Sequence, residues 1–302
     1  MNSSSRTEDR LLEEFVQRVK GDAKQSYFMK AYCDKSLNKF DLSLFKHWEQ
    51  DLPCRIIRNL LCTGEIDEKL PQQVQGSSGK QLEALILRSK AEIKNTGNDS
   101  LCIGFPLVQK YDHSSGKVLL CPLILWKVNI DTTVSGRIVL QRNFMDPVHL
   151  NDSFCEYMRT NCDVDLRKTK SYRKSKDMFN EVDIENLISY LGFDISSEEI
   201  FAYLQGAMYS ELPKVPAEAA IRGNPDRIIW GGLLSLFKAD NTCILGDLET
   251  YQHDNVTLSC QPILSERHLR YSGIYMDPSQ QMVMDLMSSD KSVVINGPPG
   301  TG

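Results

Sequence analysis

The chain has 302 residues, of which 41% are apolar and 25% are charged. These values are typical of a globular protein with about two domains, and they argue against disordered, fibrous and membrane-spanning chains. The 40 acidic residues outnumber the 35 basic ones, giving a net charge of −5. This balance excludes a uniformly basic nucleic-acid coat but leaves room for a local basic patch.

Cysteine and histidine usage argues against disulfide and metal frameworks. The nine cysteines are an odd number and form no C-x-x-C pair, so neither a disulfide scaffold nor a zinc ribbon is indicated. We expect reduced thiols that behave as small hydrophobes, as at Cys62 and Cys121. The five histidines lack ligand spacing, so no metal site is predicted. No signal peptide or spanning segment is present, which predicts a cytoplasmic protein without a membrane partner.

Residues 1–97 are predicted to be mainly helical. A capping box formed by Ser5 and Glu8 precedes an amphipathic pattern that continues to Val19. Further helical patterns cover Tyr27–Trp48, Arg55–Cys62 and the segment from Leu82 to Ile93. This first region is therefore expected to be a helical domain.

Residues 98–150 are predicted to form a small antiparallel β unit. The expected strands are Leu101–Lys110, Lys117–Ile130 and Gly136–Gln141. The first two are rich in branched apolar residues and are joined by the hairpin signal Asp112–Gly116. Because proline cannot donate to a central ladder, Pro106 and Pro122 are expected at bulges or edges.

Residues 151–270 are predicted to be a mixed, mainly helical accessory region. Apolar residues expected on one helical face are Leu187, Ile188 and Leu191. The stretch Pro213–Pro216 is interpreted as a linker. Periodicity does not decide between helix and strand for Ile228–Phe237 and Cys243–Leu248.

The most informative residues lie at the end of the chain. A buried-strand pattern, Lys291–Asn296, runs directly into Gly297, Pro298, Pro299, Gly300, Thr301 and Gly302. These are the first six positions of the phosphate-binding signature G-x-x-x-x-G-K-[ST]. In such a loop, the glycines allow backbone N–H groups to surround the β-phosphate at the start of a helix. The pattern predicts a nucleotide-binding P-loop.

A glutamine upstream indicates which class of ATPase this is. Gln280 follows Asp277-Pro278-Ser279 and lies 17 residues before Gly297. Its carboxamide can donate to and accept from the adenine edge at once. This arrangement resembles the Q motif and motif I of superfamily 1 helicases, particularly the branch that includes the nonsense-mediated-decay RNA helicase. The resemblance implies that Gln280 recognises adenine and that the P-loop residues 297–302 hold the phosphates of ATP with Mg²⁺.

Two other segments carry a weaker resemblance. Val118–Trp126 and Leu233–Leu248 look like segments in the region that precedes the helicase domain of large bacterial helicase-like ATPases. Such proteins often carry a nuclease domain and belong to anti-phage defence or DNA-processing systems. The resemblance therefore implies a nuclease domain or a partner protein as a further component.

A basic run is a candidate nucleic-acid contact. Its candidate residues are Arg167, Lys168, Lys170, Tyr172, Arg173, Lys174 and Lys176. The cations suit phosphate contacts, and the tyrosine suits stacking on a base. Acidic residues on both sides of the run, such as Asp165 and Asp177, could equally neutralise it as a solvated surface.

The expected fold class is α/β multidomain. A helical and antiparallel β accessory region is expected over residues 1–270, followed by the start of a RecA-like P-loop domain at residues 271–302. The expected function is that of an ATP-dependent superfamily 1 helicase or translocase acting on DNA or RNA, with single strands as the expected substrate. The 302-residue chain alone is expected to be inactive, because the loop's lysine and Mg²⁺-binding hydroxyl are missing from it. The alternatives are an AAA+ remodelling ATPase and a non-catalytic module that binds nucleic acid or a partner.

Overall fold

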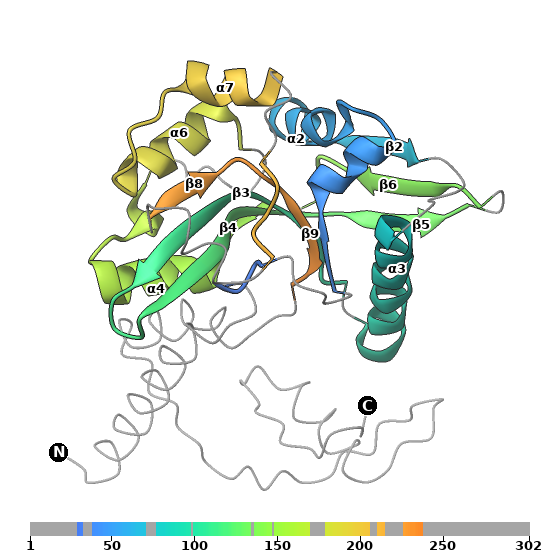
Figure 1. Ribbon diagram of the computed structural model, residues 1–302, viewed down its shortest axis with the longest axis horizontal. Helices are drawn as coiled ribbons and strands as arrows, with labels where there is room; N and C mark the ends of the chain where they lie inside the picture. The colour runs from blue at the N-terminus through green and yellow to red at the C-terminus, as the bar shows by residue number, and fades with distance from the viewer. Residues whose placement is uncertain are drawn as a thin grey trace, which may run out of the picture. The chain divides into compact units, whose positions relative to one another are not determined.

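The fold is mixed α/β, with helices packed around two antiparallel sheets (Figure 1). The computed structural model describes residues 29–32, 38–70, 77–97, 99–133, 136–146, 148–169, 179–205, 210–214 and 226–237. The chain divides into two compact units, residues 1–253 and 254–302, and every described residue belongs to the first unit. The predicted α/β class is confirmed at this level.

The larger sheet contains six strands in the order β1-β9-β3-β4-β7, with β8 also pairing with β3. Its strands are β1 (Lys39–Asp41), β3 (Leu101–Asp112), β4 (Lys117–Lys127), β7 (Val148–Leu150), β8 (Arg227–Ile229) and β9 (Leu233–Leu236). The predicted hairpin is confirmed, because β3 and β4 pair from Cys102 opposite Lys127 to Asp112 opposite Lys117. Strands from three of the expected sequence regions thus share one sheet.

Strand β4 is buried on both faces, which explains its nearly continuous apolar sequence. Leu119 and Cys121 belong to the main hydrophobic core. Val118 and Leu120 belong to a second cluster, which includes Leu212 from the segment that follows the helices. Burial on two faces makes this hairpin the centre of the described fold.

The segment left undecided by periodicity, Ile228–Phe237, forms β8 and β9. Both strands pair with β3. Leu107 lies opposite Ile229 and Gly104 lies opposite Leu233, so two residues of β3 face three residues of the partner segment. The register therefore shifts at residues 230–232, which form a bulge. Gly231 is required there, because an added Cβ would lie 2.5 Å from the backbone oxygen of Ser210.

The smaller sheet has three antiparallel strands in the order β2-β6-β5. They are β2 (Ile66–Leu70), β5 (Asn129–Thr132) and β6 (Ile138–Arg142). The predicted third strand exists as β6, but it pairs with β2 and β5 instead of extending the hairpin. Strand β2 was not predicted from the sequence because only Ile66 and Leu70, at its two ends, are buried.

Helices cover the sheets on several sides. They are α2 (Leu52–Cys62), α3 (Ser77–Thr96), α4 (Asp152–Cys162), α6 (Glu181–Tyr190) and α7 (Ser197–Gln205), with the 3₁₀ segments η2 (Leu42–His47) and η3 (Leu166–Lys168). Helix α7 packs against both α6 and α2, and Figure 1 shows these three together at one border of the β layer. The helices predicted at α2 and α3 are confirmed. So is the buried face formed by Leu187, Ile188 and Leu191.

The predicted helix over Tyr27–Trp48 is wrong in its described part. Residues 39–41 form strand β1, and residues 42–47 form η2. Strand β1 pairs with β9, and the Asp41 side chain accepts a hydrogen bond from the Ser43 backbone at 2.8 Å, which caps η2. Pairing with a strand almost 200 residues away thus overrides a local helical pattern.

Of the two prolines, Pro106 agrees with the prediction and Pro122 differs from it. Pro106 lies in the inner strand β3 opposite the bulge between β8 and β9, in line with the predicted bulge. Pro122 lies in the inner strand β4 instead of at an edge, just beyond the point where pairing with β7 begins at Ile124. In the described part of the expected linker, Pro213 is buried and Lys214 is exposed. The predicted helix at residues 5–19 and the segment 243–248 lie outside the described residues.

Candidate functional site

The predicted nucleotide site lies outside the part of the chain that the structure describes. This applies to Gln280 and to the loop residues 297–302. The last described element before them is β9, which lies between β1 and β3 in the larger sheet. The backbone of Phe237, just after β9, donates to the carbonyl of Ser100 at 2.8 Å. The chain therefore leaves the described fold from an inner strand.

The structure describes only the start of the basic run. Arg167 and Lys168 lie in η3. The other candidate residues lie outside the described residues: Lys170, Tyr172, Arg173, Lys174 and Lys176. The two described cations have different surroundings, and the difference bears on which of them could reach a phosphate.

Arg167 faces a buried carboxylate on α4. The Glu156 side chain is 0% exposed, and its Oε2 lies 3.7 Å from Nη2 of Arg167. Arg159 donates to both oxygens of Glu156 at 3.0 and 3.1 Å, and the Thr160 hydroxyl donates at 3.0 Å. A buried carboxylate needs such compensation, since an unpaired buried charge is costly. The Arg167 guanidinium thus has an internal structural partner.

Lys168 is directed toward solvent. Its side chain is 73% exposed, and its Nζ lies 3.7 Å from Oδ2 of Asp165. An exposed pair at this distance contributes little to stability and leaves the ammonium accessible. Of the two described cations, Lys168 is the one placed to contact a phosphate.

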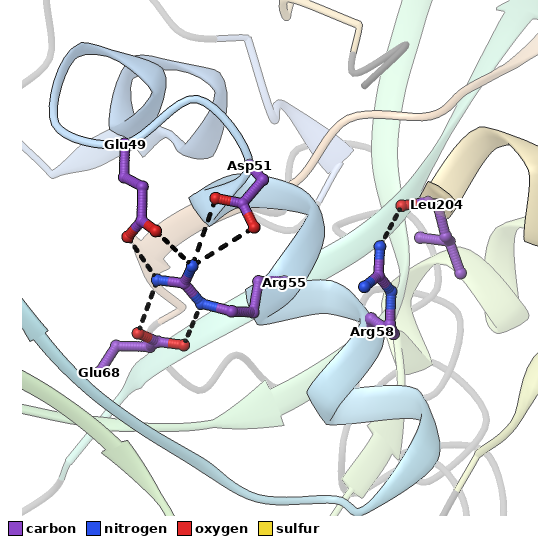
Figure 2. A network of polar contacts seen from close by, with 6 residues as sticks. All are labelled: Glu49, Asp51, Arg55, Arg58, Glu68 and Leu204. Atoms are coloured by element: carbon purple, nitrogen blue, oxygen red, sulfur yellow. Dashed lines mark hydrogen bonds and ion pairs between the residues drawn. The ribbon is translucent and has the colours of Figure 1, made fainter. Parts of the chain in front are cut away.

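A second charged network lies at the start of α2, shown in Figure 2. Arg55 donates to both oxygens of Glu49 at 2.8 and 2.6 Å, and to both oxygens of Glu68 at 3.0 and 3.1 Å. Asp51 adds an ion pair at 3.3 Å. The hydrogen bonds that Arg55 donates to Glu49 and then to Glu68 raise the pKa of Arg55 above its ordinary value. This guanidinium is occupied by protein carboxylates, so it ties α2 to β2 and is not a free anion-binding group.

The opposite end of α2 contacts α6 and α7. The Arg58 side chain donates to the backbone oxygen of Leu204 at 3.1 Å, also visible in Figure 2. The Cys62 sulfur lies 3.7 Å from Oε1 of Glu181. The expectation that Cys62 is a buried thiol is wrong, because this side chain is exposed. Cys121 is buried as expected.

One buried carboxylate fixes the segment before β8. Oδ1 of Asp41 accepts from Ser43 and Oδ2 accepts from the backbone of Leu212, each at 2.8 Å. Burial raises the pKa of Asp41 above its ordinary value, and the two backbone hydrogen bonds oppose that rise. Asp41 therefore acts as a structural clamp between β1 and the segment at residue 212. Asp41 lies in a segment that was predicted to be helical, so no sequence signal indicated this role.

The described residues contain neither a metal cluster nor a helix suited to a membrane. Among the residues that the structure describes, no group of three or more His, Cys, Asp or Glu side chains could hold a metal ion. None of the described helices is long and apolar enough to span a bilayer.

Comparison with known proteins gives no match. No family model, no curated protein and no solved structure is significantly similar to this chain. The residues of the chain itself are therefore the basis for assigning a function.

Proposed function

We propose that this chain is part of an ATP-dependent superfamily 1 helicase or translocase that acts on single-stranded nucleic acid. The observation that carries the proposal is the order of its last residues. Gln280 precedes by 17 residues the loop Gly297–Gly302, which itself directly follows the strand pattern Lys291–Asn296. A P-loop alone is shared by many ATPases, so the glutamine at this spacing is what favours a helicase.

The proposed roles of these residues follow from their chemistry. Backbone N–H groups of Gly297–Gly302 would hold the β-phosphate, because such loops present several donors to one anion. Gln280 would form two hydrogen bonds with the adenine edge. Hydrolysis of Mg²⁺-ATP supplies free energy, and the protein would couple this free energy to movement along a nucleic-acid strand.

The described α/β unit would be the accessory part of this machine. It would contact the nucleic-acid strand, and the exposed ammonium of Lys168, in the basic run, is a described candidate for such a contact. Phosphate contacts of this kind position a strand without reading its sequence. DNA and RNA are both substrates compatible with this role.

The nucleotide preference of a Gln280→Ala variant of the intact protein tests the proposal. Removing the carboxamide removes contacts to the base and none to the phosphates, so ATP affinity should fall while GTP affinity stays unchanged. One bidentate contact is worth about 1–3 kcal/mol, which corresponds to at least about a fivefold loss for ATP. Titration with fluorescent ATP and GTP analogues measures both affinities.

The adjacent glutamine provides a matched control. Gln281→Ala makes the same chemical change one position along the chain, and it should leave both affinities unchanged. Equal losses for ATP and GTP in Gln280→Ala would contradict adenine recognition by Gln280. That result would favour the AAA+ alternative, which shares the loop but does not depend on this glutamine.

A further inference from the structure

Three elements meet at the C-terminal end of α2. The helix ends with backbone hydrogen bonds from Thr63 and Gly64 to the carbonyl of Asn59. Gly64 has a positive φ of 70°, and an added Cβ would lie 3.5 Å from Cβ of Phe144 in the turn between β6 and β7. Cys62 contacts Glu181 at the start of α6. The end of α2 thus brings the β6–β7 turn and the start of α6 together.

Each of these three elements carries exposed side chains of low polarity. Phe144 is 50% exposed, Met145 is 74% exposed and Val182 is 54% exposed. Cys62, near the end of α2, is exposed as well. Single exposed hydrophobes are common, but clusters of them mark interaction sites. We call these four side chains the α2-end patch.

The turn that carries Phe144 and Met145 is held rigidly. The backbone of Asp146 donates to Asn143 at 3.0 Å, and the Asn143 side chain accepts from the backbone of Met145 at 2.9 Å. Arg142, which is only 2% exposed, donates to the carbonyls of Gly64 and Asp146. Two apolar side chains are therefore presented on a preorganised support, which lowers the entropic cost of binding.

The patch is neutral and its surroundings are acidic. Partial desolvation of its sulfur and then the nearby Glu181 carboxylate raise the pKa of the Cys62 thiol above its ordinary value, so this side chain stays uncharged near neutral pH. The carboxylates next to these residues in the chain are exposed at Glu65 and half-exposed at Asp146, Glu181 and Asp183. Two cations lie nearby, but both are engaged inside the fold: Arg142 is buried, and Arg58, which acts on Cys62, donates to the backbone oxygen of Leu204.

We propose that the α2-end patch docks a protein segment whose apolar side chains are flanked by lysine or arginine, such as a basic amphipathic helix. The apolar side chains of that segment cover Phe144 and Met145, and its cations face the surrounding carboxylates. Complementary charge of this kind steers association and rejects other partners. This proposal does not depend on the ATPase function.

Two other occupants fit the surface less well. Nucleic acid would bring phosphates against the carboxylates, which repel them. A two-fold interface pairs the same surface of two copies. A second copy of the chain that met this patch through its own patch would therefore place its carboxylates against those of the first copy. A basic protein segment is the occupant that matches both the apolar and the charged features.

Binding of defined peptides tests the proposal. The probes are a labelled amphipathic Leu/Lys peptide of about 18 residues, long enough to be helical, a matched Leu/Glu peptide and a single-stranded oligonucleotide. Fluorescence anisotropy should show that the chain binds the Leu/Lys peptide and that F144S/M145S binds it about tenfold more weakly. Circular dichroism establishes that the variant is folded.

An apolar control and a charge variant complete the experiment. Leu87 is 69% exposed on α3, so Leu87→Ser should bind the Leu/Lys peptide as the unchanged chain does. Glu65→Gln should reduce the preference for the Leu/Lys peptide over the Leu/Glu peptide. Equal binding of both peptides by the unchanged chain, or an unchanged affinity in F144S/M145S, would overturn the proposal. So would loss of oligonucleotide binding in F144S/M145S with peptide binding intact.

Discussion

Several charged side chains of the described fold are engaged with one another. Glu156 is fully buried and shares its two oxygens among Arg159, Thr160 and Arg167. Arg55 is likewise surrounded by carboxylates at the start of α2. These arrangements assign a structural role to Arg55 and to Arg167, and Arg167 is one of the candidate phosphate contacts predicted from the sequence.

Arg55→Ala should destabilise the fold, because it leaves three carboxylates without their shared cation. For a half-exposed network of this kind we expect a loss of about 1–2 kcal/mol in the free energy of unfolding near pH 7. Urea denaturation measures it. Arg137→Ala, at an exposed position, is the control and should have little effect.

The effect of Arg55→Ala should also depend on pH. The hydrogen bonds from Arg55 are the main reason that the pKa of Glu49 lies below its ordinary value of 4.5. A carboxylate with a lowered pKa stabilises the fold above its ordinary pKa, and this contribution is lost as the pH falls through the lowered value. The difference between the unchanged chain and Arg55→Ala should therefore shrink in acid. A difference that stays constant from pH 7 to pH 3 would contradict this assignment.

At the scale of elements, η3 contains the first two cations of the basic run, Arg167 and Lys168. The other cations of the run follow it in the chain. If the later cations neutralise phosphates of a single strand, R173A/K174A should flatten the dependence of log affinity on log salt by about 0.7 for each phosphate that is no longer neutralised. Tyr172→Ala should weaken binding by about 1–3 kcal/mol with little change in slope, because stacking releases no counterions. Oligonucleotide titrations at several salt concentrations measure both quantities.

Arg167 supplies the matched control for this experiment. Its ion pair with the buried Glu156 predicts that Arg167→Gln lowers thermal stability but leaves the salt slope unchanged. An unchanged slope in R173A/K174A would show that the run is a solvated surface and that nucleic acid follows another path.

The pattern of apolar residues within a segment correctly predicted the helices and strands whose buried face can be recognised from that segment alone. The β3–β4 hairpin, α2 and the face of α6 that includes Leu187 all have strong periodicity or a turn signal at the right place. The failures involve long-range partners. Strand β1 exists because it pairs with β9, and β6 leaves the hairpin because β2 pairs with it.

The described part of the candidate site was only partly predictable for the same reason. Arg167 and Lys168 are neighbours in a run of cations, yet one meets a buried carboxylate from α4 and the other meets solvent. No local pattern distinguishes them. The α2-end patch likewise depends on Cys62, Phe144 and Val182, which lie far apart in the chain.

At the scale of the whole molecule, the proposed machine combines a compact α/β unit with a P-loop ATPase that begins after it. Strand β9, which lies between two other strands of the larger sheet, ends at Leu236, 44 residues before Gln280.

We propose that the intact protein is an ATPase coupled to nucleic acid. The most direct test of this proposal is the rate of ATP hydrolysis by the intact protein with and without a single-stranded oligonucleotide, with Gly297→Val as the inactive reference. We predict hydrolysis that the oligonucleotide stimulates several-fold and that Gly297→Val abolishes. Hydrolysis that is indifferent to nucleic acid, or that persists in Gly297→Val, would contradict the account.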